Sequence, residues 1–384
     1  MAVEVAMALV LLVGAGLLTR SFTRLLHVDP GVNTAGVAVG WLGLPSKKYP
    51  DENSQRVAFN EILRRAQSVP GVTHAALTSA LPLSGTMQNK ITFEGHPNPK
   101  GQEPLIQVQM ITADYFRTMG IRLLMGRQFG PTDGQGGARV VWIDEALAKR
   151  YLPGENPIGK WLVHGGVDSK EPKQLIAGVV NQVHDSGLDS RATGIIYIPF
   201  DRSPQSWMSL VVKSALPLEE TMPALRREIA SFDKQLPLSN QQSLAEIVDG
   251  SVGQERFTMF VLGIFAVVAL MLAAVGVYGV IGYLVAQRSH EFGIRMALGA
   301  QRASIVGLVT RRVLVISGAG VIVGLGTASI ASGVMTKLLY DTQPMDVATY
   351  AGAALALLLV AMIAALVPTM RATRVSPAAT MRSE

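Results

Sequence analysis

Three segments in the last third of the chain contain no charged residue, and they constrain the fold more than any other feature. They are residues 257–287, 313–336 and 347–370. Each is longer than the roughly 20 apolar residues that an α-helix needs to cross a bilayer core. The alternative is three buried helices of a large soluble core, but protein alone seldom buries three such runs so close together in one chain. The segments therefore predict three transmembrane helices.

A fourth apolar segment lies near the N-terminus, in residues 5–19. It is uncharged but only fifteen residues long, with Glu4 before it and Arg20 after it. A signal peptide is the rival interpretation, but a signal peptide should open with a basic region, and no lysine or arginine precedes residue 20. We therefore predict a transmembrane helix within residues 1–19 whose first turn is clipped.

The distribution of charge orients these helices. Residues 20–256 are nearly neutral, with 25 Lys and Arg against 23 Asp and Glu. Loop 288–312 has five Arg and one Glu, tail 371–384 has three Arg and one Glu, and loop 337–346 has one Lys and two Asp. Because basic loops face the cytoplasm, loop 288–312 and the tail are predicted inside, and residues 20–256 and 337–346 outside. A nearly neutral outer domain also predicts no nucleic-acid partner.

The outer region has the pattern of an α+β domain, and it contains no disulfide because the chain has no cysteine. A helix is predicted from Asp51, with apolar residues at helical spacing, and another over residues 218–232. A half-exposed strand is predicted at 106–110, where "IQVQM" alternates apolar and polar residues. Further short strands are predicted at "GVAVGWLGL", "RVVWID", "LIAGVV", "GIIYIPF" and "MSLVVK". Together they predict a split βαβ unit with a β-rich insertion at about residues 116–203.

The end of the outer region predicts a helical connection to the membrane. Ser243 and Glu246 have the spacing of a capping box, in which each residue bonds the other's backbone amide. No proline follows before Pro344, so the helix is expected to continue into the span that begins at Phe257. A break at one of two interior glycines is the alternative, because an interior glycine costs only about 1 kcal/mol.

Motifs for catalysis are missing from the sequence. "GENPIGKW" resembles a phosphate-binding loop, but Trp161 replaces the hydroxyl residue that contacts magnesium, and Pro157 removes a backbone donor. The six histidines are scattered without metal-ligand spacing, and no G-x-S-x-G occurs. We therefore predict no catalytic residue, no metal and no cofactor, which disfavours a membrane-anchored hydrolase. The three long spans also lack ionisable groups, so the energy for any transport is expected to come from elsewhere.

The basic loop has the features of a docking element. "EFGIRMAL" predicts a short helix in which Glu291 and Arg295 form an i,i+4 pair, and Gly299 is placed to end it. "QRASIVGLVTRR" predicts the start of the next helix, which leads into the span at Val313. Such an element suits two tasks: lying on anionic lipid, or docking into a groove of a cytosolic protein.

This loop, "QRSHEFGIRMALGAQRASIVGLV", resembles the signature loop of the MacB/FtsX-type ABC transporter permeases. The ending "RATRVSPAATMR" and the segments "ADYFRTMGIRLLMGRQF", "VVWIDEALAKRYLPGENPIGKWL" and "IAGVVNQVHDSGL" are similar to the same family's tail and periplasmic core. The resemblance covers essentially the whole chain. It is greatest to the acidobacterial duplicated orphan permeases, which carry two such units, so this chain looks like one unit, similar to the second half.

The resemblance implies a fold, a location and a set of partners. The fold is an α-helical membrane domain of four transmembrane helices, with a large α+β MacB-like periplasmic core domain between the first and second helices. The location is the bacterial cytoplasmic (inner) membrane, with residues 20–256 periplasmic. The implied partners are a cytosolic ABC ATPase subunit that binds ATP, a second permease unit as homodimer or paired half, a periplasmic adaptor or partner, and membrane lipid.

The resemblance also implies that loop 288–312 couples to the ATPase. The residues carried over to this role are Arg288, Glu291, Phe292, Gly293, Ile294, Arg295, Leu298, Gly299 and Ala300. Closure of the ATPase pair would then be transmitted to the outer domain, which is mechanotransmission. Two functions follow: an efflux permease that exports or extracts a hydrophobic or peptidic substrate such as an antibiotic, peptide or lipoprotein, or an FtsX-like signalling scaffold that switches a periplasmic partner without transport.

Overall fold

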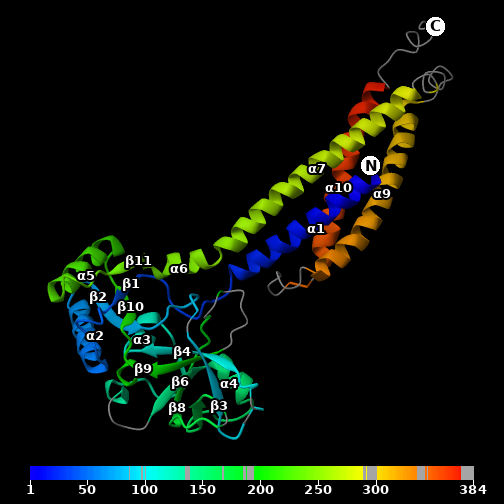
Figure 1. The fold of residues 1–384 in the computed structure, drawn as a ribbon. Helices are drawn as coiled ribbons and strands as arrows, with labels where there is room; N and C mark the ends of the chain where they lie inside the picture. The colour runs from blue at the N-terminus through cyan, green and yellow to red at the C-terminus, as the bar shows by residue number, and fades with distance from the viewer. Residues whose placement is uncertain are drawn as a thin grey trace. The chain divides into compact units, whose positions relative to one another are not determined.

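The computed structural model describes most of the chain and divides it into two compact units. The described residues are 1–85, 87–96, 98–99, 101–134, 139–166, 168–184, 187, 194–288, 291, 301–334, 342–343 and 345–372. One unit comprises Met1–His27 and Gln254–Glu384, and the other comprises Val28–Gly253. The first unit is helical, and the second contains all the strands that the structure describes (Figure 1).

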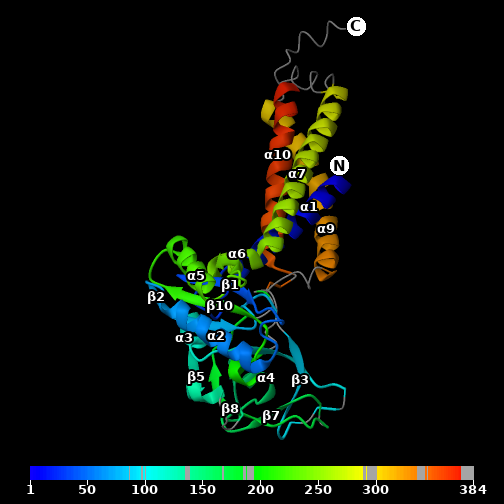
Figure 2. The ribbon, with the colours of Figure 1, turned by 60° about the vertical axis from the view of Figure 1, so that its left-hand side comes forward.

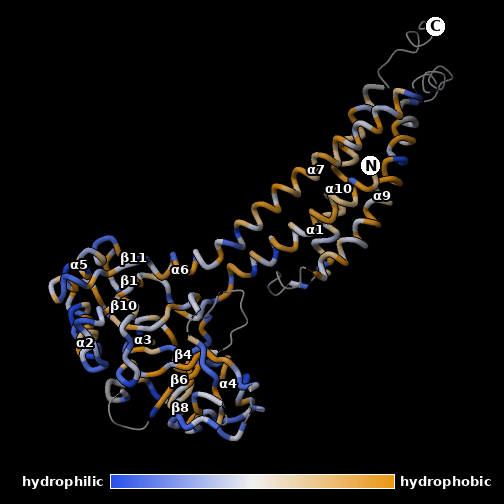
Figure 3. The backbone as a smooth tube through the Cα atoms, viewed as in Figure 1, coloured by the Kyte–Doolittle hydropathy of each residue, from blue (hydrophilic) through white to orange (hydrophobic). Residues whose placement is uncertain are grey.

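The helical unit contains four helices that are long and apolar enough to cross a membrane. They are α1 (Ala2–Leu25), α7 (Gly253–Gln287), α9 (Arg302–Val334) and α10 (Val347–Ala372). Hydrophobic residues line each of them along most of its length (Figure 3). The four predicted spans are confirmed, and the N-terminal segment forms a helix of 24 residues.

Helix α1 packs against the other helices of this bundle through one face. Its side chains Leu9, Val13 and Leu17 are buried against residues of α9 and α10, including Val321 and Leu357. The helices lie side by side in both ribbon views (Figure 1, Figure 2). Because lipid tails are as apolar as these side chains, close packing rather than the hydrophobic effect holds such helices together.

Two glycines of α9 allow α1 to approach closely. Gly320 and Gly324 form a G-x-x-x-G motif, which is typical of close helix contacts in membranes. A Cβ atom at Gly320 would lie 2.7 Å from the carbonyl oxygen of Ala2, and one at Gly324 would lie 2.9 Å from Cδ2 of Leu9. The contact therefore requires glycine at both positions.

The outer unit is built on one eleven-stranded sheet whose neighbours run in the order β11-β1-β10-β2-β4-β3-β7-β8-β6-β9, with β5 paired to β8. The strands before residue 130 are β1 (Val37–Gly43), β2 (Val72–Thr78), β3 (Gln88–Phe93), β4 (Leu105–Ile111) and β5 (Leu123–Gly126). The later strands are β6 (Val140–Asp144), β7 (Trp161–His164), β8 (Gln174–Val180), β9 (Ile195–Pro199), β10 (Trp207–Ser214) and β11 (Ser239–Ser243).

Six of these strands close into a ring. Strand β4 pairs with β3 on one side and, in parallel, with β9 on the other, where Val108 faces Ile196. The pairings β3–β7, β7–β8, β8–β6 and β6–β9 complete the circuit. The ring therefore takes strands from residues 88–111 as well as from 140–199.

Two helices cover the open part of the sheet. Helices α2 (Glu52–Gln67) and α5 (Leu218–Phe232) bury Phe59, Ile62 and Leu225 against β1, β2 and β10. Both helices begin close to the positions expected from the sequence, α2 after the capping residue Asp51. Strand β10 lies between β1 and β2, which α2 connects, so the predicted split βαβ unit is present. The β-rich ring, however, also takes β3 and β4, which precede residue 116, the predicted start of the insertion.

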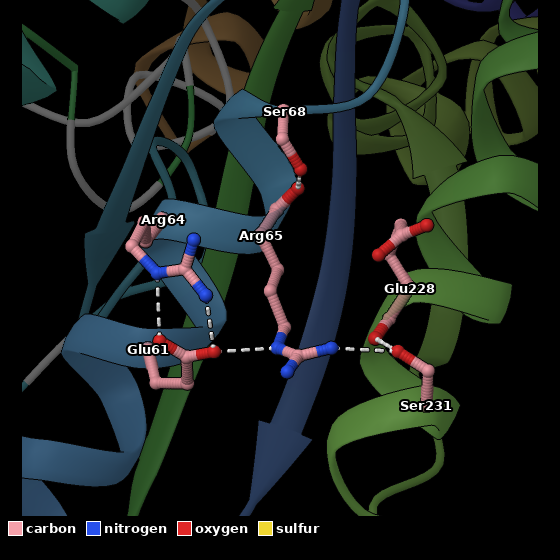
Figure 4. Close-up of polar contacts among 6 residues, drawn as sticks. All are labelled: Glu61, Arg64, Arg65, Ser68, Glu228 and Ser231. Atoms are coloured by element: carbon pink, nitrogen blue, oxygen red, sulfur yellow. Dashed lines mark hydrogen bonds and ion pairs between the residues drawn. The ribbon is translucent and has the colours of Figure 1, made fainter.

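A polar cluster also joins these two helices (Figure 4). The Arg65 guanidinium donates from Nε to Glu61 on its own helix (2.6 Å) and from Nη1 to the Ser231 hydroxyl of α5 (2.7 Å). Hydrogen bonds from Arg64 and then from Arg65 lower the pKa of Glu61 to about 2. The cluster holds α2 and α5 in a fixed register at the surface.

A buried carboxylate ends α5. Asp233 accepts a hydrogen bond from Nζ of Lys48 at 2.7 Å and from the Tyr49 hydroxyl at 2.9 Å. The hydrogen bond from Lys48 is the main reason that the pKa of Asp233 lies below its usual range, and burial followed by the Asp233 carboxylate raises the pKa of Tyr49 to about 12. Asp233 therefore stabilises the folded unit in its ionised form.

Replacing Asp233 with asparagine is expected to cost about 1 kcal/mol at neutral pH, a Tm decrease of about 2–4 °C. Because folding lowers this pKa, the stabilisation is complete above the ordinary value of 3.8 and disappears as pH falls through the lower folded value. The Tm difference between parent and variant should therefore shrink as the pH is taken below 3.8. The matched control is Asp249→Asn, at an exposed position of helix α6 (Leu244–Ser251), and an equal decrease in both variants would contradict the prediction.

Two local predictions are wrong. The strand at 106–110 is buried on both faces, with Gln107 1% and Gln109 4% exposed, because β4 lies inside the sheet and its polar side chains face other protein groups. The helix that begins after Ser243 does not continue unbroken: the predicted capping box is present, but α6 (Leu244–Ser251) ends before Val252 and α7 is a separate helix. Val252 has φ −105° and ψ 11°, outside the helical range.

Candidate functional site

The candidate site is the end of the helical unit from which the basic loop emerges. Helix α7 ends at Gln287, and the Arg288 amide still donates to the Leu284 carbonyl oxygen at 3.2 Å. Helix α9 begins at Arg302, eleven residues before the predicted span, as the sequence indicated for "QRASIVGLVTRR". The loop is thus held between two long helices.

The ends of these two helices pack on each other and on α10. Val277, Ile281 and Val285 of α7 meet Val309 and Val313 of α9, with Ala361 and Ala365 of α10 beside them. A space of about 30 Å³ between α7 and α9 is lined by Leu284, Val285, Leu308 and Val309, with Arg288 and Arg312 at its edge. That is about the volume of one water molecule, so the base of the loop is close-packed.

The base is also strongly basic. Arg288, Arg311 and Arg312 are exposed at this end of the bundle. The closest carboxylate oxygen described near Arg288 belongs to Glu291, at 4.0 Å, and these two side chains are 47% and 44% exposed. An exposed ion pair of that length contributes little to stability, so the arginines remain available to lipid headgroups or to an acidic partner surface.

Of the nine predicted coupling residues, the structure describes two, Arg288 and Glu291, and it places them together. The other seven, Phe292 through Arg295 and Leu298 through Ala300, lie outside the described residues. The expected pair of Glu291 with Arg295 lies partly outside them as well. The apolar base formed by α7 and α9 was not predicted, because a helix that is hydrophobic all round carries no periodic pattern to mark its packed face.

A second polar site lies at the opposite end of the bundle. Arg20 of α1 forms an ion pair with Asp346, which also accepts from the Thr349 hydroxyl at 2.6 Å and the Thr349 amide at 2.9 Å. These hydrogen bonds from Thr349, more than Arg20, lower the pKa of Asp346. The Tyr350 hydroxyl donates to the Ser332 hydroxyl at 2.9 Å and joins α10 to α9. Asp346 caps α10, a role that its position before an apolar run could have indicated.

No group of three or more metal-ligating side chains is found among the residues that the structure describes. The "GENPIGKW" segment forms a surface turn followed by β7, with Asn156 accepting from the Ile158 amide at 3.0 Å.

Two family models match the chain. The model described as the MacB-like periplasmic core domain matches residues 5–232, and the model described as the FtsX-like permease C-terminal matches residues 263–377. The second match includes most of α7, the whole of α9 and α10, and the whole basic loop.

Curated relatives share 24% identity with the chain. The probable syringafactin export ATP-binding/permease protein SyfD of Pseudomonas syringae pv. tomato aligns over 93% of this chain and 56% of its own length. The macrolide export ATP-binding/permease protein MacB of Neisseria meningitidis aligns over 61% of this chain and 36% of its own length. The chain thus spans about half the length of SyfD and about a third of the length of the Neisseria MacB protein.

Among solved structures, the periplasmic region of MacB from Actinobacillus actinomycetemcomitans is similar to the chain with a TM-score of 0.39 and 16% sequence identity. The similarity covers 59% of this chain and 97% of that one.

Proposed function

Since the chain belongs to the family of ABC permeases with a MacB-like periplasmic core domain and an FtsX-like C-terminal region, we propose that it is the permease subunit of an ABC export system. It is a multi-pass membrane protein with a periplasmic domain, and the permease region is not itself catalytic. The ATP that drives the system is bound by a separate ABC ATPase, as the joint ATP-binding and permease names of the relatives suggest.

The observation that carries this proposal is the close-packed basic base at the ends of α7 and α9. When a loop connects two helices that pack against each other, a displacement of the loop moves both helices. A loop between unpacked helices would instead change its own conformation. Arg288, Arg311 and Arg312 surround this base. We assign residues 288–300 as the surface that docks on the ATPase, with Phe292, Ile294 and Leu298 as its apolar contacts.

The proposed cycle uses the ATPase as the source of motion. ATP binding closes the ATPase pair and moves the docked loop, and α7 carries the displacement along the bundle. Helices α6 and α7 are separate, with the non-helical Val252 between them. The displacement therefore reaches the outer domain through a break in the helix and not through one continuous rod. The domain of residues 28–253 responds on the periplasmic side by releasing or extracting its substrate.

The substrate class that we propose is hydrophobic or peptidic. The relatives are named for the export of syringafactin, pyoverdine and macrolides. Segments 257–287, 313–336 and 347–370 carry no Asp, Glu, Lys or Arg, which favours action at the periplasmic face over a polar path through the bilayer.

A second permease unit is part of the proposal, either as a homodimer or as the other half of a duplicated permease like those of the acidobacterial group. Helix α7 is the least buried of the four spans, with 17% of its central window buried inside the chain. Its exposed side includes Phe260, Phe265, Met271 and Leu272. A second unit would cover part of this surface, and lipid the remainder.

The docking loop is tested by two substitutions that each introduce a negative charge. Arg295→Glu and Leu298→Asp are each expected to reduce co-purification of the ATPase from native membranes in mild detergent by about tenfold, because each places a new negative or polar group in a contact surface. The amount of permease in the membrane should not change. The matched control is Lys337→Glu, a charge reversal in the loop predicted to face the other side.

Co-purification that is unchanged in both loop variants would overturn the docking assignment. Recovery of a periplasmic hydrolase together with the ATPase, without export activity, would instead favour the signalling scaffold. The ATPase is identified by mass spectrometry of the parent sample before the variants are compared.

A further inference from the structure

The first half of α9 has a packed side and an exposed side. Val309, Val313 and Ser317 follow one another at four-residue spacing and are buried within the helical unit. The exposed side has the i, i+3, i+4, i+7 spacing of one helix face and continues a further seven residues along the helix. We call it the α9 stripe, and it consists of Leu308, Arg311, Arg312, Val315 and Ile322.

The α9 stripe changes from charged to apolar at the edge of the membrane span. Arg311 and Arg312 are the last charged residues before the uncharged segment 313–336. Beyond them, Val315 is 65% and Ile322 72% exposed. Arginines near the end of a membrane helix extend their guanidinium groups to the interface, where lipid phosphates lie, while apolar residues of the same face contact acyl chains.

The arginines at this end of the helical unit outnumber the carboxylates in any conformation of the loop and the tail. Loop 288–312 and tail 371–384 together contain eight Arg and two Glu, so two glutamates can neutralise at most two of the eight charges. Glu291 lies 4.0 Å from Arg288, which is therefore left out of the site. No hydrogen bond or ion pair joins Arg311 or Arg312 to another residue that the structure describes.

The choice of arginine over lysine indicates the anion. All eight basic residues of the loop and the tail are arginines, whereas ten of the 25 basic residues in 20–256 are lysines. A guanidinium group is planar and binds a phosphate through two parallel hydrogen bonds, which an ammonium group cannot do. The composition of this end therefore favours a phosphate over a general attraction to negative charge.

The apolar part of the stripe distinguishes a lipid from the other phosphates and from an acidic protein. A soluble phosphate would contact Arg311 and Arg312 alone and leave Val315 and Ile322 without a role. A cytosolic protein cannot reach these two apolar side chains, because they lie within the uncharged segment 313–336. A phospholipid contacts both parts of the stripe at once.

We propose that the α9 stripe is a binding site for an anionic phospholipid, with the headgroup phosphate held by Arg311 and Arg312. The acyl chains lie along Val315 and Ile322, and the anionic lipid is drawn to this position by the excess of arginine around it. The site lies on the side of α9, separate from residues 288–300, which are proposed to dock on the ATPase.

The test is native mass spectrometry of the full chain in mild detergent, incubated with equal amounts of phosphatidylglycerol and phosphatidylethanolamine that carry identical acyl chains. The parent is expected to retain phosphatidylglycerol about tenfold more tightly, since each arginine near an anionic headgroup contributes several-fold. Excess sn-glycerol 1-phosphate should not displace the lipid. No ATPase is present, so the result is independent of the docking assignment.

The variant Arg311→Gln with Arg312→Gln should lose the preference for phosphatidylglycerol. The matched control is Arg371→Gln with Arg374→Gln, which removes the same charge from the tail and should keep the preference. Each variant is checked by gel filtration for a single folded species. Arg311→Lys with Arg312→Lys is a second variant that keeps the charge, and it should show a preference between those of the parent and the glutamine variant.

Four outcomes would overturn the proposal. The first is equal retention of the two lipids by the parent, and the second is an unchanged preference in the Arg311→Gln, Arg312→Gln variant. The third is an equal loss in the tail variant, which would show a diffuse attraction by charge and not a site on α9. The fourth is displacement by sn-glycerol 1-phosphate, which would assign the two arginines to a soluble phosphate.

Discussion

Replacing Gly324 with leucine is expected to destabilise the four-helix unit by about 3 kcal/mol, because overpacking at a close contact forces the helices apart. A side chain at this position would enter the space of Leu9 and of the α1 backbone, whose Ala6 Cα lies 3.1 Å from the position of a Cβ. The measurement is the thermal unfolding temperature of the detergent-purified protein, together with the fraction that elutes as a single species in gel filtration. Both should fall.

Gly326→Leu is the matched control. It makes the same substitution two residues along the same helix, at a position where a Cβ would meet nothing within 4 Å. Both variants remove an unfavourable helical glycine, so the difference between them isolates the contact with α1. A Gly324→Leu protein that is as stable as Gly326→Leu would show that α1 does not need this close approach.

Replacing Gln109 with leucine is expected to cost about 3 kcal/mol in the outer domain and to lower its Tm by about 6–12 °C. The Gln109 amide nitrogen lies 2.6 Å from the Thr78 hydroxyl, 2.7 Å from the Ala80 carbonyl oxygen and 2.9 Å from the Tyr115 hydroxyl. Leucine fills a similar volume but donates nothing, so these buried acceptors would lose a shared donor.

The control for Gln109 is Gln88→Leu, at an exposed position of β3. Differential scanning calorimetry or a thermal shift assay on the two variants gives the comparison. If both variants unfold at the parent's temperature, the buried amide does not hold β4 to the turn after β2.

The parts of the fold that the sequence could predict are those set by local pattern. Charge-free segments predicted the four spans, the Ser243–Glu246 spacing predicted the start of α6, and helical periodicity predicted α2 and α5. Each of these signals is contained within about thirty residues of chain, so no knowledge of distant partners is needed.

The parts that it could not predict depend on distant residues. Closure of the ring needs β4 to pair with β9, about ninety residues later, and the polar side chains Gln107 and Gln109 are buried only because of such pairing. The α1–α9 contact was within reach, because the G-x-x-x-G spacing of Gly320 and Gly324 is visible in the sequence.

Ring closure has a consequence for how such a domain survives folding outside the cytoplasm. A sheet of this size would ordinarily expose two long rows of unpaired backbone groups, to which a neighbouring unfolded chain could add as a further strand. Among the described strands the sheet path ends in a circuit, and its borders include β5, with four residues, β11, with five, and β2, which pairs with β4 only at Thr78. The β11 sequence "SNQQS" is polar throughout. The ring strands of many copies emerging side by side from a membrane therefore offer one another very little template for intermolecular strand exchange.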